Sequence, residues 1–260
     1  MNKVAGVLSY KPRKLVLNLA KAVGIKYAPI TNPRRFLRAS YEWDTIFNWG
    51  SSGWEAMEGQ TIYNHPKFIK HAVNKRQCLK TLEKQGCPVI PWTRDQEQAT
   101  RWLEHGHWVM SRERIMGARG QGCVLVKELE DANLLAEGKF YTMFKKKCRE
   151  FRIHAAFGKC ILYQQKRRRE DFDNLPGNDN FVRNSGSGWV FCIKDVKHVE
   201  LLEEVGVKAI EALQLDYGSV DIVYHQNTPY ILEVNTASSI SGKSTMQAYV
   251  DAFQGKLNAA

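Results

Sequence analysis

Two short runs near the C-terminus decide the fold of this chain. They are Ser219-Val-Asp-Ile-Val-Tyr224 and, after a turn at residues 225–229, Tyr230-Ile-Leu-Glu-Val-Asn235. Apolar and polar side chains alternate within both runs, which is typical of strands with one buried and one open face. The two runs therefore predict a β-hairpin.

The register of this hairpin decides which side chains share a face. A hairpin centred on Asn227 places Asp221 opposite Glu233 and Ser219 opposite Asn235, with Cβ atoms of opposed residues about 5 Å apart. Asp221, Glu233 and Asn235 then lie on one face. The other face would pack on a helix and carries Val220, Ile222, Leu232 and Val234.

Two opposed carboxylates repel each other, so this pairing is explained if a cation lies between them. The oxygen atoms of Asp221, Glu233 and Asn235 suit Mg²⁺, which leaves coordination positions for water and phosphate oxygens. We expect one or two Mg²⁺ ions, with Mn²⁺ as an alternative. A solvated face in a different register is the competing interpretation.

The N-terminal third of the chain predicts a small α/β unit. Its pattern indicates a strand at residues 4–9, a helix at Lys14–Val23 that ends at Gly24, and a strand at residues 41–48.

The middle and the end of the chain predict further helices and strands. Helices are indicated at 67–85, 99–105 and 195–213, with a short final helix at the C-terminus. Strands are indicated at 108–111, 124–126 and 150–155, with a return strand at 160–164. The glycine-rich segment Gly117-Ala-Arg-Gly-Gln-Gly122 joins the first two strands as a hairpin loop.

Composition excludes several classes of protein. The chain has 260 residues and a formal net charge of +11, which predicts attraction to an anionic ligand or partner. It contains no run of about 18 apolar residues and no secretory signal, so we expect neither membrane insertion nor export. Its six cysteines show no C-x-x-C spacing, and we expect a cytoplasmic protein. Nothing in the sequence predicts its oligomeric state.

The segment Ala237-Ser-Ser-Ile-Ser-Gly-Lys-Ser244 is close to a phosphate-binding P-loop. A P-loop fold needs further parallel strands after the helix that follows this motif, one of them carrying a second magnesium ligand. Only 16 residues follow Ser244, so we reject this interpretation.

The ordered set of motifs resembles the ATP-grasp superfamily, in particular ribosomal-protein glutamate ligases, D-alanine–D-alanine ligase and compact phage-type members. Val220-Asp221 and Glu233-Val-Asn235-Thr are similar to the family's magnesium motif. The resemblance implies an α/β (α+β) fold in which two subdomains hold a nucleotide between two antiparallel sheets. It also implies a small N-terminal α/β domain at 1–73, one ATP-grasp subdomain at 74–140 and the other at 141–260.

The same resemblance implies an ATP site. Lys75 and Arg112 would bind phosphates, Glu150 would accept the ribose hydroxyls, and Lys166 would contribute a further positive charge. The backbone of Thr142, Met143 and Phe144 would meet the adenine. The loop containing Gly120, Gln121 and Gly122 would fold over the phosphates. A plain ion pair between Glu150 and Arg152 is the structural alternative for that carboxylate.

The implied activity is an ATP-dependent carboxylate–amine ligase that proceeds through an acyl phosphate and releases ADP and phosphate. Arg183 and Asn184 would lie near the phosphate and the substrate. The substrates would be a small-molecule or peptide carboxylate and an amine, and the net charge allows an anionic acceptor such as an acidic peptide or a nucleic acid.

Two departures from the family pattern affect the substrate site. Ser238 and Ser239 stand where relatives have Pro-Gly, so the acceptor is not predicted. Ser219 replaces an Arg of the D-alanine ligases, which removes one positive charge unless Arg183 supplies it.

The alternative function is a basic nucleic-acid-binding protein on an inactive ATP-grasp scaffold. It depends on the net charge and on two basic clusters, at residues 145–149 and 166–169. Few aromatic residues are interleaved with these clusters, so stacking on single strands is not indicated. A solvated run of charges is the simpler interpretation of both clusters.

Overall fold

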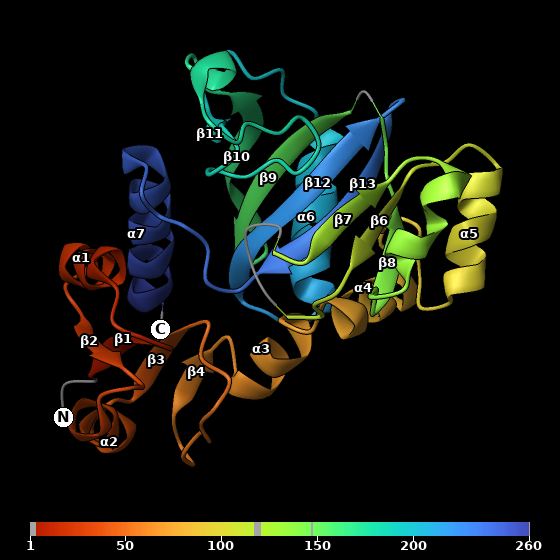
Figure 1. The fold of residues 1–260 in the computed structure, drawn as a ribbon. Coiled ribbons are helices and arrows are strands. Elements are labelled where there is room, and N and C mark those ends of the chain that lie inside the picture. The colour runs from red at the N-terminus through yellow and green to blue at the C-terminus, as the bar shows by residue number, and fades with distance from the viewer. Residues whose placement is uncertain (1–3, 117–120, 147, 260) are drawn as a thin grey trace.

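The computed structural model describes residues 4–116, 121–146 and 148–259. In these residues the strands form three sheets. Figure 1 shows a parallel sheet in the N-terminal unit on the left, a five-stranded antiparallel sheet in the middle and a four-stranded antiparallel sheet on the right. No helix among them is long and apolar enough to cross a bilayer.

The N-terminal unit is the predicted α/β unit, with a parallel sheet in the order β2-β1-β3-β4. Its elements are β1 (Ala5–Ser9), α1 (Lys14–Val23), β2 (Lys26–Pro29), α2 (Pro33–Glu42), β3 (Thr45–Trp49) and β4 (Thr61–Tyr63). Helix α1 ends as predicted at Gly24, whose φ of 85° favours glycine.

The strand predicted at residues 41–48 is wrong in its first part. Asn32 caps α2 by accepting a hydrogen bond from the backbone N–H of Arg35, and Pro33 fixes the first helical turn. The helix so started continues to Glu42, and the strand begins only at Thr45.

The single helix predicted at residues 67–85 is two helices, α3 (Pro66–Ala72) and α4 (Lys75–Lys84). Asn74 causes the break, because its side chain caps the second helix by accepting from the N–H of Gln77. This break places Lys75 in the first turn of α4.

An antiparallel sheet in the order β5-β8-β6-β7 follows. Its strands are β5 (Trp92–Thr93), β6 (Val109–Arg112), β7 (Cys123–Val126) and β8 (Phe140–Met143). The helix α5 (Gln96–Glu104) and the 3₁₀ helix η1 (Leu129–Leu135) pack on it through a shared apolar core. The pairing of β6 with β7 confirms the predicted hairpin, whose loop residues 117–120 lie outside the described residues.

The larger antiparallel sheet has the order β11-β10-β9-β12-β13. Its strands are β9 (Arg149–Ala156), β10 (Lys159–Arg168), β11 (Trp189–Cys192), β12 (Tyr217–His225) and β13 (Thr228–Asn235), with the 3₁₀ helix η2 (Phe172–Asn174) before β11. Helix α6 (Glu200–Ala212) covers one face (Figure 1). The helix predicted from residue 195 starts later, because Asp195 has a φ of 52° and leaves the helical region.

The final helix α7 (Lys243–Asn258) has 16 residues, so the prediction of a short helix is wrong. It packs on the N-terminal unit, beside α1 (Figure 1). Phe253 stacks on Phe47 with ring centroids 4.2 Å apart, and Tyr249 meets Trp49 edge-on at 5.0 Å. The C-terminal helix thus completes the N-terminal core.

The register of the last hairpin confirms the predicted pairs. Asp221 is opposite Glu233, and Ser219 is opposite Asn235. The predicted centre at Asn227 is wrong, because a two-residue turn at Gln226-Asn227 pairs His225 with Thr228.

A β-bulge between these two parts of the hairpin restores the predicted pairing, since Ile222 faces Ile231 while Asp221 faces Glu233. Leu232 is the extra residue. It lines the cleft described below, and the fully buried Ile231 takes the place predicted for Leu232 against α6.

Candidate functional site

A cleft of about 960 Å³ lies between the antiparallel sheet β5-β8-β6-β7 and the five-stranded sheet. Residues of the N-terminal unit close one end of it. Three carboxylates line it: Glu150, Asp221 and Glu233. Ten cationic side chains of the described residues also line it: Lys11, Arg13, Lys14, Lys75, Arg112, Arg114, Lys145, Arg152, Lys166 and Arg183. The excess of positive charge suits a polyanionic ligand.

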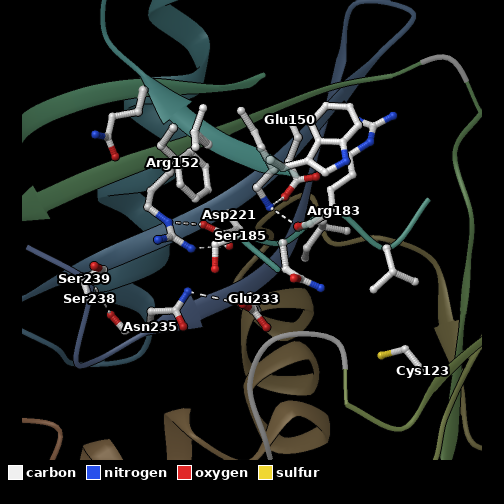
Figure 2. A pocket seen from close by; sticks show the side chains of 18 of the residues that line it. Cys123, Glu150, Arg152, Arg183, Ser185, Asp221, Glu233, Asn235, Ser238 and Ser239 are labelled. Atoms are coloured by element: carbon white, nitrogen blue, oxygen red, sulfur yellow. Dashed lines mark hydrogen bonds and ion pairs between the residues drawn. The ribbon is translucent and has the colours of Figure 1, made fainter. Parts of the chain in front are cut away.

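Asp221 is held by Arg152 from the neighbouring strand β9, where the two residues are opposite each other in register. The Nε atom of Arg152 donates to Oδ1 of Asp221 at 2.6 Å, and Nη2 donates to Oδ2 at 2.8 Å (Figure 2). The guanidinium also lies 4.1 Å from the ring centroid of Phe191. Burial by itself lowers the pKa of Arg152, but Asp221 outweighs burial and raises it, so the guanidinium stays charged.

Glu233 is paired with the ammonium group of Lys75, at the start of α4. The amide Nδ2 of Asn235 donates to Oε1 of the same carboxylate at 3.4 Å (Figure 2). Burial raises the pKa of Glu233, but Lys75, Arg112 and Arg152 together lower it to about 2. Glu233 is therefore ionised at neutral pH.

Asp221, Glu233 and Asn235 fit a hard divalent cation. They present two carboxylates and one amide, which are oxygen ligands of the kind that such a cation prefers. Both carboxylates already form ion pairs with cationic side chains of the protein. No group of three or more His, Cys, Asp or Glu that could hold a metal ion is found among the described residues. Mg²⁺ is commonly bound by one or two carboxylates together with water and phosphate oxygens. Asp221 and Glu233 can supply these carboxylates, with Asn235 beside them.

Glu150 and Lys166 form a second buried ion pair, with both side chains 9% exposed. The ammonium of Lys166 also donates to the backbone oxygen of Arg183 at 2.9 Å. Burial raises the pKa of Glu150, and Lys166 opposes this. The predicted structural alternative, an ion pair between Glu150 and Arg152, is wrong, because Arg152 pairs with Asp221 instead.

Arg183 and Asn184 both line the cleft, as their predicted role requires. Arg183 donates from Nη1 to the backbone oxygen of Cys148 at 3.1 Å and lies 4.7 Å from the Trp189 ring centroid. The Oδ1 atom of Asn184 accepts from the backbone N–H groups of Gly186 and Ser187. These contacts fix the loop before β11 over the cleft.

Arg112 ends β6 and faces the cleft, with a buried Nε atom that has no hydrogen-bond partner among the described residues. Gln121 lines the cleft beside Arg114, and Gly122 follows it with a φ of 68°. The predicted contact at Gly120 lies outside the described residues.

Thr142, Met143 and Phe144 line the cleft wall where the two sheets meet. The backbone N–H of Met143 donates to Pro91 and that of Phe144 to Trp108. These two backbone donors are therefore already used within the protein.

The basic cluster at residues 166–169 is held by internal contacts. Arg167 donates to the backbone oxygen of Asp195, Arg168 donates to Asn180, and Arg169 pairs with Asp171. These contacts reduce the support for a nucleic-acid surface built on this cluster.

Arg152 is the main site residue that the sequence did not assign. Its alternation with Glu150 on a strand predicted a shared face, but the partner across the sheet depends on the order of β9 and β12. A second residue that the sequence did not assign is Gln164, which lines the cleft and hydrogen-bonds to His154 and to Thr245, another lining residue.

No protein-family model matches the chain, and no curated protein matches its sequence. Solved structures match its fold. ATP-grasp ligase PsnB, in complex with a phosphomimetic variant of its minimal precursor, Mg and ADP, has 13% identity and a TM-score of 0.68 over 97% of this chain and 99% of that chain.

Two further solved structures match the fold over nearly the whole of this chain. N5-carboxyaminoimidazole synthetase from Staphylococcus aureus with ADP has 13% identity and a TM-score of 0.69 over 98% of this chain and 78% of that chain. D-alanine–D-alanine ligase from Bacillus anthracis has 12% identity and a TM-score of 0.62 over 99% of both chains. The chain therefore has the ATP-grasp fold, and the predicted fold class is confirmed.

Proposed function

We propose that the protein is an ATP-dependent carboxylate–amine ligase. The observation that carries this proposal is the convergence of Asp221, Glu233 and Asn235 on one strand face, inside a strongly cationic cleft between two antiparallel sheets. The fold shared with ATP-grasp ligases supports it. Without that convergence the cleft would be only a general site for anions.

The nucleotide would lie between the two sheets. Lys75, Arg112 and Lys166 would contact its phosphates, and Glu150 would accept its ribose hydroxyls once Lys166 turns to the phosphates. The base would lie against the segment Thr142–Phe144 and contact backbone groups from Lys145 onward. The loop with Gly120, Gln121 and Gly122 would cover the phosphates.

Asp221, Glu233 and Asn235 would hold one or two Mg²⁺ ions, with Mn²⁺ as a substitute. Bound there, the metal supplies positive charge against the phosphate oxygens of the nucleotide. Lys75 and Arg152 offset the charge of the two carboxylates through ion pairs. With the metal bound, both side chains would turn to the phosphates instead.

The reaction would begin with attack of a substrate carboxylate on the terminal phosphorus of ATP, which forms an acyl phosphate and ADP. An amine would then attack the acyl carbon, forming the amide and releasing phosphate while the amine loses a proton. The protein mainly positions reactants and stabilises negative charge in both steps. Arg183 and Asn184, which line the cleft, would act on the transferring phosphoryl group.

Arg152 would supply the positive charge that relatives carry at the position of Ser219. Its guanidinium comes from the neighbouring strand and donates two hydrogen bonds to Asp221, two residues after Ser219. Ser219 instead accepts a hydrogen bond from Ser238, which fixes the loop after β13. Arg183, which also lines the cleft, is the alternative source of this charge.

The substrates would be a carboxylate and an amine carried by a peptide or by small molecules. PsnB was solved with a precursor peptide, so a peptide carboxylate or amine is one candidate and a small molecule is the other. The six cysteines are unpaired, which supports the proposal of a cytoplasmic protein. The division into domains at residues 73 and 140 remains part of this proposal.

The direct test is release of ADP from Mg-ATP by the purified protein, supplied with mixtures of amino acids and short peptides. We expect release that depends on one carboxylate and one amine, with a new amide found by mass spectrometry. Failure to bind nucleotide, or to release ADP with any mixture, would contradict the proposal.

A further inference from the structure

The N-terminal unit carries an unusual excess of positive charge. The first acidic residue of the chain is Glu42, and the 41 residues before it contain nine Lys or Arg. These nine account for most of the formal net charge of +11. The question is where these cations gather.

Several of them gather where the N-terminal unit meets the cleft. Lys11, Arg13 and Lys14 follow β1 and line the end of the cleft next to the loop at residues 237–242. Arg13 is fixed there, since Nη1 donates to the backbone oxygen of Ala237 at 3.4 Å and Nη2 donates to the hydroxyl of Tyr10.

A second cavity, of about 490 Å³, lies on the other side of the same residues. Arg13 and Lys14 line both cavities, and Arg35 lines the second one together with Tyr27 and Asn32. The two cavities and the cations between them form a continuous basic strip, defined here as Lys11, Arg13, Lys14 and Arg35.

The described residues provide no carboxylate for this strip. None of its four side chains takes part in an ion pair there, in contrast to Lys75, Arg152 and Lys166. The first turns of α1 and α2 contain no acidic residue, and α1 has no side-chain cap. The backbone dipoles at these helix starts add to the positive potential.

The basic strip also lies where ligands usually bind in a sheet of this kind, just beyond the carboxyl end of a strand. The chain leaves β1 for β2 on one side and later adds β3 on the other, so the order β2-β1-β3-β4 reverses at β1. In open parallel sheets, ligands bind beyond the carboxyl ends of the strands at such a reversal. Lys11 and Arg13 lie directly after the carboxyl end of β1.

We propose that the basic strip of Lys11, Arg13, Lys14 and Arg35 binds an acidic peptide, which lies across both cavities and presents its reacting group to the cleft. This inference rests on the proposed ligase function and names its substrate class. A peptide fits better than a compact acid because the cations extend beyond the cleft into the second cavity. An extended chain spans about 3.3 Å per residue and can follow such a strip.

The test measures binding of a fluorescently labelled hexaglutamate peptide by anisotropy, with Mg²⁺ and a non-hydrolysable ATP analogue present. The informative variant is Lys14→Gln with Arg35→Gln. The matched control is Lys21→Gln with Lys84→Gln, which removes two exposed charges at the far ends of α1 and α4. Hexaglutamine, free glutamate and a single-stranded DNA oligonucleotide are the comparison ligands.

We expect hexaglutamate to bind about tenfold more weakly to the strip variant than to the wild type or the control, and hexaglutamine not to bind. Equal binding by both variants, or no binding to the wild type, would overturn the inference. Free glutamate binding as tightly as the peptide would overturn the peptide assignment, and DNA binding more tightly would replace it with a nucleic-acid partner.

Binding of the ATP analogue, measured by calorimetry in the same variants, separates this inference from the proposed function. We expect it to be unchanged in the strip variant. Loss of peptide binding with intact nucleotide binding supports the strip. Failure of the wild type to bind the analogue would instead contradict the ligase proposal, and peptide binding that persists under that condition would overturn the link between the strip and the cleft.

Discussion

The two ends of the cleft differ in how their charged side chains are paired. At the hairpin end, each of the three carboxylates is paired with a cation: Asp221 with Arg152, Glu233 with Lys75 and Glu150 with Lys166. At the N-terminal end, the cations of the basic strip have no carboxylate partner among the described residues. The carboxylates of the first end are therefore neutralised by cations of the protein itself, whereas the cations of the second end are open to the acidic peptide that we propose.

The largest effect should follow from removing Lys75. The change Lys75→Met removes the main cationic partner of the buried Glu233 carboxylate and a predicted phosphate contact. We expect ADP release to fall by about a hundredfold or more, as for loss of a charge-stabilising group. Lys80→Met, a change at an exposed position of the same helix, is the control. Equal activity in both variants would contradict the functional role of the Lys75–Glu233 pair at the hairpin end.

The change Arg152→Lys should have a smaller effect. Lysine keeps the charge but cannot make the two parallel hydrogen bonds to Asp221. We expect ADP release to fall about tenfold, with a loss of about 1–2 kcal/mol in the free energy of unfolding measured by urea denaturation. Arg149→Lys, at an exposed position of the same strand, should be near neutral, and a similar loss there would contradict the specific role of Arg152.

The pH dependence of stability tests the buried network behind the cleft. His154 contacts Tyr249 and Gln164, and burial together with Arg152 lowers its pKa to about 4. In the unfolded chain its pKa is about 6.5, so the unfolded state binds the proton more readily between these two values. The contribution of His154 to the free energy of unfolding is therefore fully present above about pH 6.5 and is lost as the pH falls towards 4.

The expected contribution of His154 to this decrease is about 3 kcal/mol. It should be visible as a fall in the midpoint of urea unfolding between pH 6.5 and 4. The variant His154→Gln lacks this titration and should show a shallower decrease over the same range. An equally steep decrease in the variant would assign the pH dependence to other groups.

The smallest effect should come from the basic strip. Since Lys14 is exposed and has no ion pair in the described part of the chain, Lys14→Gln should change the free energy of unfolding by less than about 0.5 kcal/mol. A destabilisation as large as that of Arg152→Lys would show that the strip is part of the structure rather than a surface open to a partner. Thermal and urea unfolding of both variants in the same buffer provide the measurement.

Local patterns were sufficient to predict most elements of the fold. The alternation around Asp221 and Glu233 predicted the hairpin, and the spacing of Leu15, Leu19 and Val23 predicted α1 with its end at Gly24. Capping was the source of two of the errors in the helices, the missed α2 and the break between α3 and α4. Asn32 and Asn74 each start a helix through a side-chain hydrogen bond, which the spacing of apolar residues does not predict.

The metal face shows a limit of pattern reasoning. In a regular ladder built on the observed turn, Asp221 would face Leu232, and Glu233 would point to the helix side. The bulge moves Glu233 to the cleft, so the predicted pair is correct although the predicted centre is wrong. Arg152 could not be assigned, because the sequence does not contain the strand order that places β9 beside β12.

The most direct test of the central claim is the magnesium dependence of nucleotide binding. A non-hydrolysable ATP analogue would be titrated by calorimetry into the wild type and into Asp221→Asn with Glu233→Gln, with and without Mg²⁺. Glu83→Gln with Glu211→Gln, two exposed positions, is the charge-matched control.

We predict that Mg²⁺ strengthens binding at least tenfold in the wild type and in the control but not in the hairpin variant. An equal effect of Mg²⁺ in all three proteins would contradict the claim that this hairpin holds the metal against the nucleotide.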